Sequence, residues 1–182
     1  MKKGDQLFGQ VIGKEQKPLP INFNTGAYKQ SSNVMIEFQL QVDSRITRAV
    51  APLIAKCFSD CGKTSTPSFP YPDEQDSDLS ETWKGSLKED ISRDRQSLAR
   101  LLNDAKFKHG FVEVEEENAE LVIRAITEIR LFIRESCLVP FTDSELESGD
   151  FSLEEKPSEA QSYYLAYLVL AEVQEGLIAQ MI

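Results

Sequence analysis

The sequence predicts a mainly α-helical α+β fold in which four main helices pack around a small two-stranded sheet. Apolar residues recur at the three- and four-residue spacing of amphipathic helices over most of the chain. Two short segments alternate between apolar and polar residues instead, as strands with one buried face do. A strand–helix unit also occurs twice, because Leu40-Gln-Val42 and its helix are followed 72 residues later by Val112-Glu-Val114 and another helix.

Residues 34–182 are predicted to form a single globular domain, preceded by a loosely ordered segment at residues 1–33. A chain of 182 residues that is 41% hydrophobic can bury a sizeable core without disulfides or metal. The N-terminal segment mixes glycine, proline and polar residues with only short apolar pieces. Three prolines and an acidic end predict that residues 62–78 form a Pro-rich loop inside the domain.

The first half of the domain is predicted to contain one strand and two helices. Residues 34–42 alternate as a half-buried strand, and the helix that follows is expected to end at Gly62 in a left-handed cap. The second helix is predicted over residues 80–107, with Trp83 as a buried anchor near its start.

The second half predicts a strand at residues 110–114, a helix at 117–137 and an acidic loop at 138–157. The last helix, at residues 158–182, is apolar nearly all round between Tyr163 and Val173. Such a helix is either central to the core or part of a subunit interface. We predict a homodimer through this helix.

Charge is unevenly spread along the chain. The net charge of the chain is -10. Residues 113–159 alone also carry a net charge of -10, because they hold fourteen acidic and four basic residues. This disfavours a protein whose whole surface follows a phosphate backbone. The second helix nevertheless carries basic residues beside its buried stripe, which could contact a protein partner, nucleic acid, or the acidic segment of the same or a second subunit. These candidates are Lys84, Lys88, Arg93, Arg95 and Arg100.

Motif searches predict no catalytic residues, no metal and no cofactor. Gly62-Lys-Thr resembles the end of a phosphate-binding loop but lacks the earlier glycine and the preceding strand. Cys57, Cys61, His109 and Cys137 match no standard zinc-ligand spacing. The chain is therefore predicted not to be an enzyme, although an unrecognised site stays open as a third alternative.

The cysteine pair Cys57-Phe-Ser-Asp-Cys61 is the main chemical feature of the sequence. Residues four apart on a helix have Cβ atoms about 5–6 Å apart, whereas a disulfide needs about 3.5–4.5 Å. A bond would therefore require the end of the helix to open, which would make the pair a thiol switch. The alternative is that both are small apolar core residues.

The expected compartment is the cytoplasm. The basic start Met1-Lys-Lys is not followed by the apolar stretch of a signal peptide. The longest uncharged run near the C-terminus, residues 160–171, has twelve residues and is shorter than the roughly 20 that span a bilayer. Three cysteines in such a chain are expected to be reduced thiols.

Several segments together resemble the actinobacterial family catalogued as domain of unknown function 2017. The similar stretches are 43–58, 80–103 and 111–139, and the closing 163–180 resembles that family's aromatic last helix. Arg124 and Arg130, each with the residue after it, fall on the family's Arg-Ala-Leu-Asn-Asp-Leu-Arg-Leu run.

The resemblance implies a regulator more than an enzyme. The family has no accepted enzymatic activity, and some members are described as oxidative-stress-responsive transcriptional regulators. We therefore expect a non-enzymatic regulatory protein that binds a protein partner or promoter DNA, with Cys57 and Cys61 as a thiol switch. The alternative is a structural or adaptor module for a proteolysis or sulfur-metabolism partner, with no redox response, because the family's genes often lie beside genes of those processes.

Overall fold

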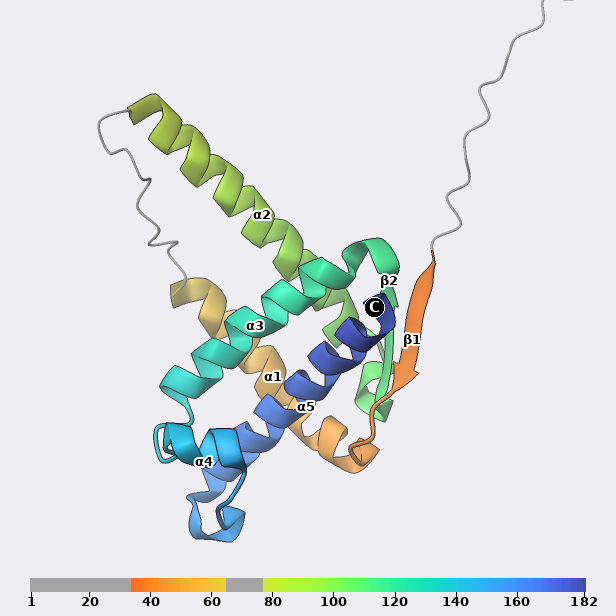
Figure 1. The fold of residues 1–182 in the computed structure, drawn as a ribbon, viewed down its shortest axis with the longest axis vertical. Coiled ribbons are helices and arrows are strands. Elements are labelled where there is room, and N and C mark those ends of the chain that lie inside the picture. Colours follow the sequence, from red (N-terminus) through yellow and green to blue (C-terminus); the bar gives the residue numbers. More distant parts are fainter. Residues whose placement is uncertain (1–33, 65–76) are drawn as a thin grey trace, which may run out of the picture. The chain divides into compact units, whose positions relative to one another are not determined.

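A computed structural model describes residues 34–64 and 77–182, which form helices packed beside one two-stranded sheet (Figure 1). The predicted fold class is therefore confirmed. The predicted N-terminal segment at 1–33 and most of the predicted Pro-rich loop lie outside the described residues. In chain order the strands and α-helices are β1 Met35–Gln39, α1 Ser44–Thr64, α2 Ser77–Asn103, β2 Phe111–Glu115, α3 Ala119–Ser136, α4 Asp143–Ser148 and α5 Ser158–Met181.

The two strands pair with each other in an antiparallel sheet. In its register Ile36 lies opposite Val114 and Phe38 lies opposite Val112, so the alternation places their side chains on one face. Ile36, Val112 and Val114 are buried in the core. The two strand–helix units of the sequence therefore meet through their strands, with β1 leading to α1 and β2 leading to α3.

The last helix, α5, is part of the core. It packs against α1, α3 and β1, and Leu170, Val173 and Leu177 are fully buried. A Cβ atom at Gly176 would lie 2.5 Å from Cζ of Phe38, so glycine lets β1 approach α5 closely. The core accounts for the buried side of this helix, whereas Leu168, Ile178 and Met181 are exposed. The homodimer stays a prediction.

Helix α1 does not end at Gly62 as predicted. It continues to Thr64, and Gly62 is not among the glycines with positive φ. The glycine serves a close contact instead, because a Cβ atom there would lie 2.8 Å from the guanidinium carbon of Arg95 on α2. The first residues of the predicted 62–78 loop are therefore helical.

Helix α2 begins at Ser77 and ends at Asn103, and its first half is exposed. Trp83 is 45% exposed, so its prediction as a buried anchor is wrong. In Figure 1 the first half of α2 extends beyond α3, and the buried residues of α2 begin only at Asp94. Phe107, predicted as the last residue of this helix, lies in a separate 3-10 turn at Phe107–His109.

The predicted acidic loop at 138–157 contains the short helix α4. Thr142 and Glu145 form a capping box at its start, and Gly149 ends it with a φ of 68°. Beside it, the rings of Phe141 and Phe151 pack on Tyr164 of α5, with centroids 5.2 and 5.1 Å away. This aromatic cluster holds the segment against α5, so part of the acidic region is ordered structure.

Lowering the pH should weaken the attachment of α4. The Lys156 ammonium, 2.7 Å from the carboxylate, and the Thr142 backbone N–H lower the pKa of Glu145 from 4.5 to about 2. Because the folded-state pKa lies below the unfolded value, this stabilisation is complete above pH 4.5 and is lost as the pH falls towards 2.

We therefore expect the difference in unfolding temperature between the wild type and Lys156→Met to shrink between pH 6 and pH 3. Thermal unfolding followed by circular dichroism measures it. A difference that stays constant over this range would contradict the role given to the pair.

Candidate functional site

The three cysteines of the chain lie around the contact between α1 and α3. Cys57 and Cys61 on α1 are 2% and 3% exposed, and Cys137, which follows the last residue of α3, is half-buried. Cys57 and Cys137 are neighbours across this contact. Cys61 donates instead to the Glu128 carboxylate at 3.5 Å. All three are free thiols.

Burial keeps two of these thiols protonated. It raises the pKa of Cys57 to about 12, with a further increase from the neighbouring Cys137. Burial also raises the pKa of Cys137, while the hydrogen bond from Cys57 and the charge of Lys56 oppose the increase. Because the thiolate is the reactive form, these raised pKa values lower the reactivity of both thiols in the folded protein.

Arg95 connects the end of α1 to α2 and α3. From α2, its guanidinium lies over the Phe58 ring with its carbon 4.5 Å from the centroid, and it donates a hydrogen bond to the Phe58 carbonyl. It also pairs with Glu128 of α3 at 3.7 Å, the same carboxylate that accepts from Cys61. Arg95 thus binds the acidic segment of its own chain, which is the internal alternative considered from sequence.

The other predicted contact residues do not form one basic surface. Lys84, Lys88 and Arg93 are exposed on the first part of α2, and Arg93 pairs with Asp90 at 2.5 Å. Residues 77–93 carry four acidic against three basic side chains. Arg100 lies further along α2 and lines a pocket. This part of α2 therefore presents a mixed-charge surface.

The two family-pattern arginines join helices. Arg124 on α3 donates to both oxygens of Asp94 on α2, at 2.9 and 2.6 Å. Arg130 on α3 donates to Gln174 of α5 at 2.7 Å, and its guanidinium carbon lies 4.4 Å from the centroid of the Tyr167 ring. Both positions therefore hold α3 against its neighbours.

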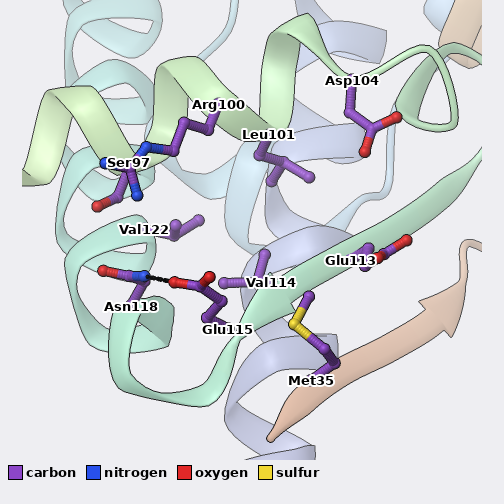
Figure 2. Close-up of a pocket in the computed structure, with 10 residues that line it drawn as sticks. All are labelled: Met35, Ser97, Arg100, Leu101, Asp104, Glu113, Val114, Glu115, Asn118 and Val122. Carbon is purple, nitrogen blue, oxygen red and sulfur yellow. Dashed lines mark hydrogen bonds between the residues drawn. The ribbon is translucent and has the colours of Figure 1, made fainter. Parts of the chain in front are cut away.

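A pocket of about 190 Å³ lies where the end of α2 faces β2 and the start of α3 (Figure 2). Figure 2 shows Arg100 and Ser97 on one side and Asp104 and Glu113 on the other, with Leu101, Val114 and Val122 between them. Asn118 donates to Glu115 at 2.5 Å within it. The lining of the pocket carries charges of both signs, from Arg100 and from the carboxylates of Asp104, Glu113 and Glu115.

Metal-binding and membrane-spanning features are not found in residues 34–64 and 77–182. No three histidine, cysteine or carboxylate side chains of these ranges are grouped to hold a metal ion. None of the helices there is long and apolar enough to cross a bilayer.

Comparison with known families assigns the chain. A family model described as a domain of unknown function (DUF2017) matches residues 65–181. The chain belongs to the DUF2017 family. No curated protein and no solved structure matches it. The DUF2017 match runs from the segment before α2 through α5, so Cys137 lies inside it, whereas α1 with Cys57 and Cys61 lies outside it.

Sequence reasoning missed the neighbour of Cys57. Cys137 lies 80 residues away and ends an apolar stripe, so its sequence position carries no local signal of the contact. The only available sign was that both cysteines lie on the core-facing sides of helices that belong to the two repeated units. Which residues of two packed helices meet depends on their crossing, and the hydrophobic pattern alone does not determine that.

Proposed function

We propose that this DUF2017 protein is a non-enzymatic regulatory protein that binds a protein partner, and that oxidation of its α1 thiols changes this binding. The observation that carries the proposal is the position of Arg95. It contacts Phe58, which lies between Cys57 and Cys61, and it belongs to the helix whose first half is exposed. The cytoplasm, where thiols are normally reduced, is the expected compartment.

The proposed switch is the pair Cys57 and Cys61, and the contacts of Phe58 and Cys61 would connect it to α2 and α3. Forming this bond requires the last turns of α1 to open, which removes Cys61 from Glu128 and Phe58 from Arg95. One hydrogen peroxide molecule oxidises the two thiols to a disulfide and is reduced to two water molecules. Without its α1 contacts, α2 would be held less firmly near Arg95.

A protein partner is favoured over promoter DNA by the charges of α2. A DNA-binding surface gains affinity by placing several lysines and arginines on phosphates, and carboxylates among them oppose that contact. In the exposed part of α2, Lys84, Lys88 and Arg93 alternate with a larger number of acidic side chains. Mixed charge suits a protein surface with a complementary pattern.

The test immobilises the full chain, reduced or peroxide-treated, and quantifies the proteins it captures. Lys88→Glu reverses a charge on the exposed part of α2, and Lys108→Glu reverses an exposed charge outside it. We expect capture to change several-fold on oxidation, to fall with Lys88→Glu and to be unaffected by Lys108→Glu.

Capture that is identical in both redox states would remove the redox response and favour the adaptor alternative. Fluorescence anisotropy with promoter-length DNA over a salt series completes the test. Specific, salt-dependent DNA binding by the wild type would replace the protein partner with promoter DNA.

A further inference from the structure

We propose that the pocket between the end of α2 and β2 binds a small ω-amino carboxylate, a molecule with a carboxylate at one end of a short carbon chain and an ammonium at the other. Arg100 and Ser97 bind the carboxylate, and Asp104 and Glu113 bind the ammonium. This ligand-binding function goes beyond the proposed redox function and does not rest on it.

The charges on the two sides of the pocket do not neutralise each other. No ion pair within residues 34–64 and 77–182 includes Arg100 or Asp104. The two are four residues apart, a spacing at which opposite charges on a helix usually meet, but α2 ends between them at Asn103. Figure 2 shows their side chains on opposite sides of the pocket. A guanidinium and a carboxylate without ion-pair partners therefore border the same cavity.

The hydroxyl of Ser97 is the second, independent observation. Ser97 is only 7% exposed, and it lines the pocket. A helical serine usually donates to the carbonyl four residues earlier, as Ser148 and Ser162 do, but the Ser97 hydroxyl has no hydrogen-bond partner within the described part of the chain. Buried hydroxyls normally have a partner, so this one is available to donate to a ligand oxygen. Beside it, the Arg100 guanidinium suits a carboxylate, which it can bind through two parallel N–H···O bonds.

The opposite side of the pocket is acidic. One oxygen of Asp104 accepts the backbone N–H of Lys106 at 2.8 Å, which orients the carboxylate and leaves its other oxygen for a ligand. Glu113 on β2 pairs with the Lys106 ammonium, and Glu115 follows it on the same face of the strand. Three carboxylates beside one lysine leave an excess of negative charge, which favours a cationic group of the ligand.

The apolar residues between the two sides determine the shape of the ligand. Leu101, Val114 and Val122 lie there, so the part of the ligand that joins its charges is a hydrocarbon chain (Figure 2). An α-amino acid carries both charges on one carbon atom and cannot place them on opposite sides. The pocket of about 190 Å³ is smaller than the roughly 300–1,000 Å³ of pockets for drug-sized molecules, so the ligand is small.

Isothermal titration calorimetry of the full chain tests the proposal with 4-aminobutanoate, 5-aminopentanoate and 6-aminohexanoate. Leucine is the matched control, because it is an isomer of 6-aminohexanoate with both charges on one carbon atom. Hexanoate lacks the ammonium altogether. We expect at least one ω-amino acid to bind with a Kd below about 1 mM, and leucine and hexanoate to bind at least about tenfold more weakly.

Variants of the pocket locate the binding. Arg100→Gln and Asp104→Asn should each weaken binding at least about tenfold, and Ser97→Ala should weaken it several-fold. Arg93→Gln is the control, because Arg93 is exposed on the same helix, pairs with Asp90 and lies outside the pocket lining. Its affinity should equal that of the wild type. Circular dichroism checks that each variant is folded.

The absence of binding by all three ω-amino acids up to about 10 mM would overturn the inference. Equal binding of hexanoate would also overturn it, because the ammonium would then have no role. Equal affinities of Arg100→Gln and Arg93→Gln would place the binding outside this pocket, with the same consequence. None of these results changes the expected redox response of partner capture, so the two proposals fail separately.

Discussion

Arg124→Ala is expected to lower the free energy of unfolding by about 2–3 kcal/mol. The Asp94 carboxylate on α2 is only 9% exposed and receives two hydrogen bonds from the Arg124 guanidinium. Removing the arginine would leave a buried carboxylate without its counter-charge. The expected loss lies below that of a fully buried pair, because the Arg124 side chain is 51% exposed and water already screens it.

Removing Asp94 should destabilise the protein less than removing Arg124. Asp94→Ala leaves Arg124 behind, and a half-exposed guanidinium can be hydrated, so we expect a smaller loss of about 1 kcal/mol. Arg93→Ala is the matched control, because Arg93 and Asp90 form an exposed pair on the same helix and should contribute almost nothing. Urea denaturation of the three variants measures the differences. Equal losses for Arg124→Ala and Arg93→Ala would show that the buried position of Asp94 is energetically unimportant.

This prediction also concerns the meaning of the family pattern. Arg124 and Arg130 lie in the segment that resembles the family pattern. In the structure each of them contacts a side chain on another helix of the same chain. A charged residue of a family pattern is commonly interpreted as a contact for a partner. Here the geometry indicates that Arg124 maintains the angle and spacing of α2 and α3, which determine where the exposed half of α2 lies.

The fold could be predicted largely from periodicity. The alternation around Ile36 and Val112 correctly predicted two half-buried strands, and the repeat suggested that their units belong together. Helix α4 could also have been predicted, since Thr142 and Glu145 have the spacing of a capping box. It was missed because the acidic composition of residues 138–157 suggested a solvated loop.

Contacts between distant residues could not be predicted in the same way. Gly62 was interpreted as a helix end because that is the common local use of glycine. Its actual reason is the guanidinium of Arg95, 33 residues later, which no local pattern reveals. The prediction that Trp83 is buried failed for a related reason. An apolar stripe predicts a buried face only where another element covers it, and the first half of α2 is exposed. The Cys57–Cys137 contact is a third case.

Gly176→Ala is expected to lower the free energy of unfolding by about 2 kcal/mol, although the same change usually stabilises a helix. The new methyl group would lie 2.5 Å from Cζ and 3.0 Å from Cδ2 of Phe38, well inside van der Waals contact. Phe38 packs against the core from β1, so either its ring or the strand must shift. The close approach of β1 to α5 at this point should make the shift costly.

Gly85→Ala separates this steric effect from helix propensity. Gly85 lies inside α2, where a Cβ atom would meet nothing within 4 Å, so the substitution should raise the free energy of unfolding by about 0.5–1 kcal/mol. Adding Phe38→Leu to Gly176→Ala should recover part of the loss, and a double-mutant cycle measures that coupling. Stabilisation by both glycine substitutions would mean that β1 moves freely over α5. The sheet would then not position the start of α1, and through it the cysteines, as firmly as its contacts indicate.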